Sequence, residues 1–145
     1  MALLEDQLAN QGYTVLNPWR LGDPREFEAA NCIRNIEERR QMLHKVNVEI
    51  AARNEQAIRE SDAIVAVLDG VDIDSGTASE IGFAYALGKR IYGYRSDFRR
   101  SGDNDGSVVN PQVQYWIEKS GGFIAASRPQ LHDYLTRIRQ PETSR

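Results

Sequence analysis

The sequence contains few of the residues from which several common kinds of site are built. Its 145 residues include one cysteine, Cys32, and two histidines, which excludes a disulfide framework and a cysteine-based metal site. No apolar run approaches the roughly 18 residues of a membrane-spanning helix. The first residues also lack the charged start and apolar middle of a secretion signal. We therefore expect a cytoplasmic protein with no membrane partner.

The chain also has no excess of basic residues. It carries 18 Lys and Arg against 21 Asp and Glu, a net charge of -3, and the basic residues are scattered. A nucleic-acid partner is therefore not expected. With 41% hydrophobic and 27% charged residues, the composition is that of a soluble globular protein. We expect one domain over residues 1–139 and a frayed tail over 140–145.

Helical patterns alternate with apolar runs along the chain. Strands that alternate with helices predict an α/β fold, a mostly parallel sheet with helices on both faces. Strands are expected over residues 13–16, 63–68, 90–95 and 122–126. Helices are expected over 1–11, 25–60, 75–87, 111–119 and 128–139, with a break in the second between about 40 and 46.

The most informative stretch joins the predicted strand 63–68 to the predicted helix 75–87. Four carboxylates lie between the end of that strand and the first turns of that helix: Asp69, Asp72, Asp74 and Glu80. In open α/β sheets, ligands bind at the carboxyl ends of the strands. Glu80 also stands among small residues, which a solvated surface carboxylate would not need. The stretch therefore predicts a ligand site.

The stretch from Ser61 to Phe98 resembles the nucleoside 2-deoxyribosyltransferases. That family carries Asp-x-Gly-Thr-x-x-Glu-Ile/Leu-Gly, then Ala-Tyr-Ala-Leu-Gly-Lys, then a strand ending near Arg-x-Asp-Phe-Arg. The chain reads DSGTASEIG at 74–82, AYALGK at 84–89 and RSDFR at 95–99. Weaker likenesses are Val-Asn at 109–110 and the segment 12–18, which is similar to the family's second strand.

The resemblance implies a flavodoxin-like three-layer α/β/α sandwich with strand order 2-1-3-4-5. The family usually begins with a strand such as Tyr-Leu-Ala-x-Pro, which would be the central one. Nothing in this sequence before residues 13–16 corresponds to it. We therefore expect the sheet to lack its usual first strand. Either strands 13–16 and 63–68 then pair directly, or the native start lies upstream.

The resemblance also implies an activity and two catalytic residues. The family passes a 2-deoxyribosyl group from one nucleobase to another through a covalent glycosyl-enzyme, as retaining glycosidases do with sugars. Glu80 corresponds to the nucleophile, and a position one turn into a helix would let the helix dipole stabilise its charge. Asp74 corresponds to the carboxylate that faces the base. Crowding by other carboxylates should raise its pKa and suit it to protonate the leaving base.

Further substrate contacts are expected from four residues. Gly76 would let the backbone turn tightly and approach the sugar, and Asn110 would bind the sugar hydroxyls. Asp69 also lies at the expected site. Asn54 stands where many members carry Asp, so it can hydrogen-bond a base but cannot act as an acid. Because the family's residue at the place of Asn110 reaches a neighbouring subunit, a homo-oligomer is expected, with deoxynucleoside and free-base substrates. No cofactor and no metal are expected.

Plainer interpretations stay open for these residues. Asp69 and Asp72 can be turn or N-cap residues, Asp74 and Asn110 can be N-caps, and Glu80 can be solvated. The pair Asp97 and Arg99 can line the pocket or form a loop salt bridge. The apolar stripe Val113, Trp116 and Ile117 can face a partner or its own sheet.

Three functions follow from these alternatives. The first is deoxyribosyl transfer. The second is hydrolysis of deoxynucleoside monophosphates, although the relatives that do this tend to carry Ser at the place of Asp74, because an aspartate repels a phosphate. The third is a non-catalytic module that binds nucleosides or nucleotides.

Overall fold

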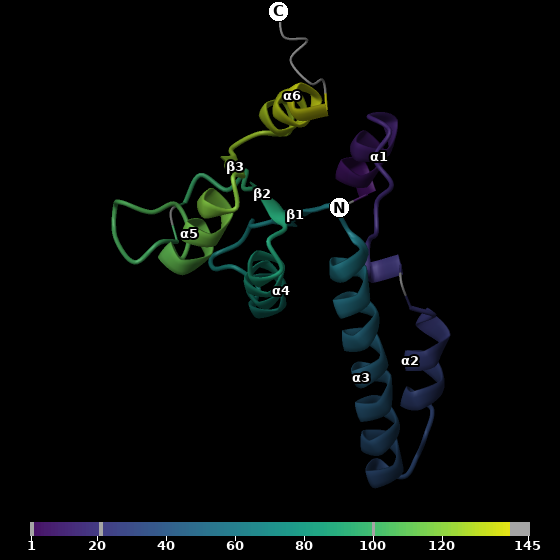
Figure 1. The fold of residues 1–145 in the computed structure, drawn as a ribbon. Helices are drawn as coiled ribbons and strands as arrows, with labels where there is room; N and C mark the ends of the chain where they lie inside the picture. The colour runs from purple at the N-terminus through teal and green to yellow at the C-terminus, as the bar shows by residue number, and fades with distance from the viewer. Residues whose placement is uncertain (1, 21, 100, 140–145) are drawn as a thin grey trace, which may run out of the picture. The chain divides into compact units, whose positions relative to one another are not determined.

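The computed structural model describes residues 2–20, 22–99 and 101–139 (Figure 1). The predicted tail over 140–145 lies outside these residues. Within them the chain is α/β, with six α-helices, one 3-10 helix and three strands. In chain order the elements are α1 (Ala2–Asn10), η1 (Pro18–Arg20), α2 (Pro24–Asn31), α3 (Ile36–Glu60), β1 (Ala63–Val67), α4 (Ser75–Ala86), β2 (Arg90–Tyr94), α5 (Pro111–Lys119), β3 (Ile124–Ala125) and α6 (Arg128–Arg139).

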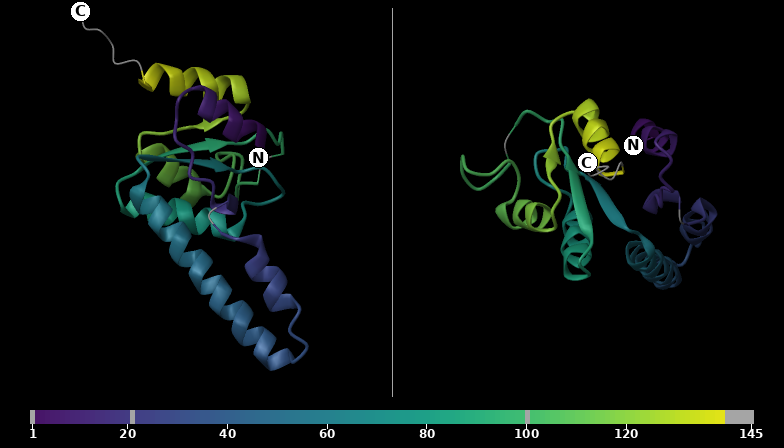
Figure 2. Two further views of the ribbon diagram at one scale, coloured as in Figure 1. Left: turned by 90° about the vertical axis from the view of Figure 1, so that its right-hand side faces the viewer. Right: turned by 45° about the horizontal axis from the view of Figure 1, so that its top comes forward.

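The three strands form a parallel sheet in the order β1-β2-β3. Helices α4 and α5 cover one face and α6 lies on the other (Figure 2). Helix α1 lies beside α6, and Gln11 after it donates to His132 O and Thr136 Oγ1. The predicted parallel sheet and its strands near 63–68, 90–95 and 122–126 are therefore confirmed, although β3 is shorter than expected.

The predicted strand over residues 13–16 is wrong, because these residues have no regular structure. Tyr13 instead completes the turn that ends α1, where its N–H donates to Leu8 O and its hydroxyl donates to Leu135 O. These two hydrogen bonds are local to the end of α1 or directed to α6. Direct pairing of 13–16 with β1 is therefore wrong as well. Among the described residues, no strand pairs with the other edge of β1.

Apolar side chains from the strands and from the helices that cover them form the core. Leu68 follows β1, Ile91 belongs to β2 and Ile117 to α5, and all three are inaccessible to solvent. Helix α4 buries Ile81 and Ala84 in the same way. This packing fixes α4 against β1 and β2, and α4 carries the residues on which the functional hypothesis depends.

The end of α4 shows why the sequence stops the helix there. Gly88 adopts a φ of 71°, which favours glycine. Its N–H donates to Tyr85 O, and the N–H of Lys89 donates to Ala84 O. These two bonds satisfy carbonyls that the helix leaves open, and the chain turns directly into β2.

The chain divides into two compact units, Met1–Thr14 with Asp62–Arg145, and Val15–Ser61. The single domain over 1–139 stays a prediction. In the smaller unit the predicted break between 40 and 46 is wrong, because α3 is continuous and the break falls before Ile36. Asn35 accepts hydrogen bonds from Glu37 N and Glu38 N, and this cap sets the start of α3.

Within the described ranges, none of the helices has the length and apolar character that crossing a membrane would require.

Candidate active site

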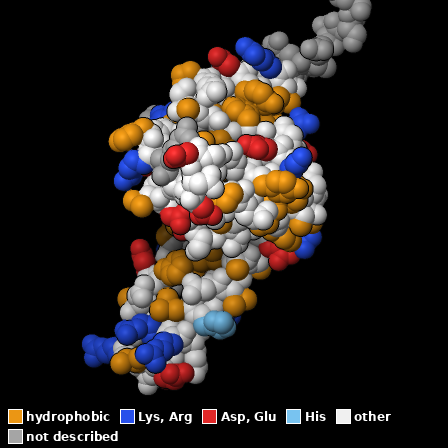
Figure 3. Space-filling model, turned by 90° about the vertical axis from the view of Figure 1, so that its left-hand side faces the viewer, with side chains coloured by type: hydrophobic (Ala, Val, Ile, Leu, Met, Phe, Trp, Pro, Cys, Tyr) orange, Lys and Arg blue, Asp and Glu red, His pale blue; other side chains and the backbone are white. Residues whose placement is uncertain are grey.

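The predicted site residues of the larger unit come from two loops and one helix. The loop after β1 leads into α4, and the loop after β2 leads into α5. Because β1 and β2 are parallel neighbours, both loops leave the same edge of the sheet. Asp69 and Asp74 belong to the first loop, and Asn110 ends the second. Acidic, basic and apolar side chains are interspersed on the face shown in Figure 3.

Asp74 is the N-cap of α4. Its Oδ2 accepts hydrogen bonds from Thr77 N at 3.0 Å and from Thr77 Oγ1 at 3.4 Å. The capping interpretation is therefore confirmed. Among the described residues, Oδ1 receives no hydrogen bond, so the carboxyl group keeps one oxygen exposed to solvent and to a ligand. Capping and contact with a base are thus compatible.

Gly76 lies in the first turn of α4 with a helical backbone. The expected tight turn at Gly76 is therefore wrong; in this region the positive φ belongs to Gly70, at 128°. A Cβ at position 76 would lie 3.0 Å from Asp74 Oδ2. Glycine at this position leaves room for the Asp74 carboxylate.

Glu80 lies beyond the first turn of α4, which holds no acidic residue. Its side chain is half-buried, and burial raises the pKa of its carboxyl group, with the charge of Asp74 adding to the effect. The influence of a helix dipole falls off within the first turn. Burial therefore opposes the ionised form of Glu80, and stabilisation of its charge by the helix dipole stays a prediction. A fully solvated glutamate does not describe this half-buried side chain.

Asp69 joins the two loops. Its carboxylate accepts hydrogen bonds from Ser96 N at 2.6 Å, Ser96 Oγ at 2.9 Å and Asp97 N at 2.9 Å. Its partners thus lie on the loop after β2 and not in a local turn. Asp72, in contrast, accepts from the N–H of Ile73, as expected of a turn residue. Both Asp69 oxygens already have donors, so its first role is to position the loops.

Arg95 is a positioning residue that the sequence reasoning missed. Its side chain is buried, and its guanidinium donates to Leu68 O, to Gly70 O at 3.1 Å and to Arg99 O at 2.7 Å. It therefore links the two loops, as Asp69 does. The signal in the sequence is an arginine directly after an apolar strand. An arginine at such a buried position needs carbonyl groups as hydrogen-bond partners.

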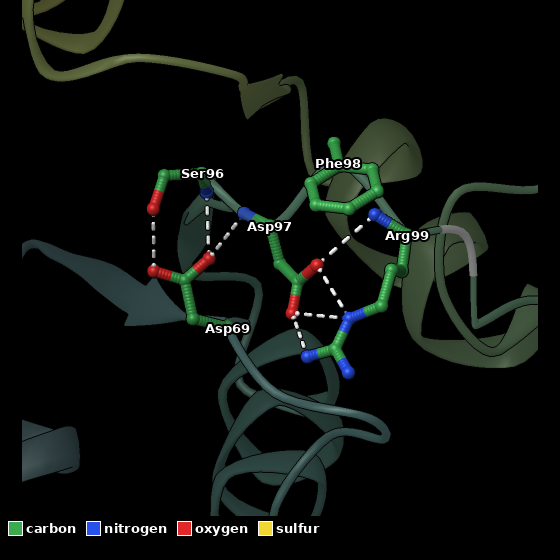
Figure 4. Close-up of a pocket in the computed structure, with 5 residues that line it drawn as sticks. All are labelled: Asp69, Ser96, Asp97, Phe98 and Arg99. Carbon is green, nitrogen blue, oxygen red and sulfur yellow. Dashed lines mark hydrogen bonds and ion pairs between the residues drawn. The ribbon is translucent and has the colours of Figure 1, made fainter.

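An open hollow lies between these loops, lined by Asp69, Ser96, Asp97, Phe98 and Arg99 (Figure 4). Arg99 forms an ion pair with Asp97 at 2.5 Å. The hydrogen bond from the Arg99 side chain holds the pKa of Asp97 far below its usual range. Both interpretations of this pair are thus right, because the two side chains line the hollow and form a salt bridge.

Asn110 is the N-cap of α5. Its Oδ1 accepts hydrogen bonds from Gln112 N at 3.0 Å and Val113 N at 3.4 Å. The side chain is exposed, and its Nδ2 has no hydrogen bond among the described residues. The cap therefore leaves a donor for a sugar hydroxyl, although a contact with substrate stays a prediction.

The apolar stripe of α5 faces its own molecule. Val113 and Ile117 are buried where α5 packs on the sheet. Trp116 stacks on Tyr85 of α4, with the ring centroids 6.3 Å apart. The stripe therefore does not supply the partner surface that the sequence allowed.

Asn54 lies in α3, in the Val15–Ser61 unit, and its contact with a base stays a prediction. No group of three or more His, Cys, Asp or Glu side chains in the described part of the chain gathers closely enough to hold a metal ion.

Comparison with known proteins gave one family. The sequence model of the family described as nucleoside 2-deoxyribosyltransferase matches residues 1–112, more than half of the chain. The matched part includes Asp74, Glu80 and Asn110. A comparison with curated proteins gave no match.

Proposed function

Because the chain belongs to the nucleoside 2-deoxyribosyltransferase family, we propose that it transfers a 2-deoxyribosyl group between nucleobases, with Glu80 as nucleophile and Asp74 as acid. One observation supports this most strongly. Glu80 is half-buried, and the charge of Asp74 raises its pKa, so the two carboxyl groups are close enough to influence each other. Asp74 ends the loop after β1, on the side of the sheet where α/β proteins bind ligands, and Glu80 follows it in α4.

The first half of the reaction breaks the glycosidic bond. A Glu80 oxygen forms a bond to the anomeric carbon while the bond from that carbon to the base nitrogen breaks. The electron pair of the broken bond leaves with the base, which takes a proton from Asp74. The product is a glycosyl ester on Glu80, and Asp74 is left as a carboxylate.

The second half reverses these steps with another base. A nitrogen of the incoming base attacks the anomeric carbon, its proton passes to Asp74, and Glu80 leaves as a carboxylate. Two inversions give net retention of configuration. No cofactor takes part, and the substrates are a deoxynucleoside and a free nucleobase.

We further propose a flavodoxin-like three-layer α/β/α arrangement, in which β1, β2 and β3 correspond to the last three strands of the order 2-1-3-4-5. Their parallel pairing in chain order and the helices on both faces support this assignment.

The direct test of the function is base exchange. The protein is incubated with deoxyadenosine and free cytosine, or with deoxycytidine and free adenine, and the products are separated by chromatography. Formation of the exchanged nucleoside supports transfer. Release of free deoxyribose without exchange would show a hydrolase, and an unchanged mixture would contradict both activities.

The raised pKa of Glu80 predicts how the rate depends on pH. The nucleophile must be ionised, so kcat/KM should rise with pH through the raised pKa of Glu80. Asp74→Asn removes the charge that contributes to the shift, so the midpoint of this rise should move to lower pH. The pH profile of both proteins, measured with one substrate, checks this. If the midpoint does not move, the rise in kcat/KM is not caused by ionisation of Glu80.

Asp74→Asn also tests the acid. Asparagine caps helices as well as aspartate, so the fold should be preserved. Cleavage of a natural deoxynucleoside should slow by about 10²- to 10⁴-fold, because the base leaves without a proton. A nitrophenyl deoxyriboside needs no protonation to leave, so its cleavage should slow much less. Equal losses on the two substrates would leave Asp74 as a helix cap alone.

A shared active site is part of the same proposal. The Nδ2 group of Asn110 is exposed at the start of α5, and the residue at this place in the family reaches a neighbouring subunit. We therefore expect a homo-oligomer at micromolar concentration, measured by sedimentation. A monomer that still transfers deoxyribose would contradict the shared site.

A further inference from the structure

Phe98 is an apolar side chain in an unusual place. The residue is 94% exposed and lies on the wall of the hollow that Asp69, Ser96, Asp97 and Arg99 also line (Figure 4). A single exposed apolar side chain is common at protein surfaces. What distinguishes Phe98 is its place on the wall of a hollow lined by polar groups, where its face is available to a flat ligand.

The turn that carries Phe98 is fixed on both sides of the ring. Before it, Asp69 accepts from the backbone N–H groups of Ser96 and Asp97. After it, the buried Arg95 donates to the carbonyl of Arg99, and Arg99 N donates to Asp97 Oδ1 at 3.0 Å. Phe98 is thus presented to solvent by an anchored turn, which lowers the entropic cost of binding against it.

The polar groups beside the ring indicate what it binds. Two carboxylates and one guanidinium line the hollow, and the guanidinium is already neutralised by Asp97. This balance repels a phosphate. The Arg99 Nη1 group has no hydrogen bond among the described residues, so one donor stays available. An aromatic face beside hydrogen-bonding groups suits a flat, uncharged heterocycle with polar edges.

We propose that Phe98 is the stacking surface of a nucleobase subsite, with Arg99 and Asp97 at the polar edge of the base. The inference rests on the proposed function for the identity of the heterocycle. It is supported by position, because Asp69 of this hollow belongs to the loop that ends at Asp74. The subsite determines how the base is held and which bases are accepted.

Equilibrium dialysis with free adenine and free cytosine tests the subsite without any chemical step. Phe98→Leu keeps an apolar side chain and removes the aromatic face, so binding should weaken about ten-fold or more. Phe98→Trp restores an aromatic face and should bind within about two-fold of the wild type. Phe27→Leu makes the same substitution at an exposed phenylalanine of α2 and should leave binding unchanged. Thermal unfolding should be unaltered in all three variants.

The outcomes separate this inference from the proposed function. Wild-type transfer with base binding that ignores Phe98 would overturn the subsite and leave the function intact. Base binding that depends on Phe98 in a protein without transfer activity would keep the subsite and remove the catalytic proposal. If Phe98→Leu changes sedimentation but not base binding, the ring is a contact between copies of the chain and the subsite is overturned. Absence of base binding by the wild type at millimolar concentration also overturns it.

Discussion

Glu80→Gln should lower deoxyribosyl transfer by about 10³-fold or more, because glutamine cannot form the glycosyl ester. The substitution keeps the shape of the side chain and removes its charge. Initial rates of base exchange measure the effect. Glu118→Gln makes the same change at an exposed position of α5 and should keep the wild-type rate. Near-wild-type transfer by Glu80→Gln would contradict the mechanism.

The melting temperature of Glu80→Gln tests whether its loss of activity comes from unfolding. The pKa of Glu80 is raised in the folded state, so folding favours its protonated form. Its contribution to stability is complete below the unfolded-state pKa and is lost as pH rises through the folded-state pKa. At pH 7, Glu80→Gln should therefore unfold at the same or a higher temperature than the wild type. The difference should vanish below about pH 4. A lower melting temperature at pH 7 would contradict this sign.

Covalent trapping identifies the nucleophile independently. A 2-fluoro-arabinosyl nucleoside slows the second step more than the first, so the glycosyl ester should accumulate. Mass spectrometry of a digest should find the label on Glu80. A label on another residue would identify that residue as the nucleophile instead.

Arg95→Met should give the largest loss of stability, about 3–5 kcal/mol in the free energy of unfolding. Methionine fills a similar volume but donates no hydrogen bond. The carbonyls of Leu68, Gly70 and Arg99 would each lose a charged donor. Urea denaturation measures the change. Arg95→Lys should also destabilise the protein, because an ammonium group cannot reproduce the planar fork of donors.

Arg99→Met is the matched control for Arg95. The Arg99 side chain is 55% exposed, whereas that of its partner Asp97 is only 12% exposed, so Arg99→Met should cost less than Arg95→Met but more than the loss of a fully exposed ion pair. Similar losses at the two positions would show that Arg95 does not hold the loops together.

Much of the sheet could be predicted from the sequence, because each strand is an apolar run bounded by turn residues. Residues 63–68 and 90–95 have this form and are the strands β1 and β2. The run 13–16 is shorter, and it follows a glycine whose turn already uses the N–H of Tyr13. A short apolar run beside a helix end is therefore a weak signal for a strand. The break before α3 has a local signal in Asn35, a strong N-cap, whereas the polar helical pattern on both sides of it does not mark the boundary.

The parts of the site that depend on neighbouring residues could be predicted from the sequence. Asp74 and Asn110 precede helices, and both caps are found. What could not be predicted depends on residues far apart in sequence. Asp69 and Ser96 are 27 positions apart, and the hydrogen bonds between them have no local pattern. The raised pKa of Glu80 likewise arises from burial, which a helical period alone does not reveal.

The anchored turn from Arg95 to Arg99 has a calorimetric consequence. Ordering the backbone of one residue costs about 1–2 kcal/mol of entropy at room temperature. Here Asp69 and Arg95 have fixed these residues before any ligand arrives. A ligand that contacts the turn therefore binds without ordering it, and its measured binding entropy should be less unfavourable in the wild type than in an Asp69→Ala protein, in which the turn is released on one side.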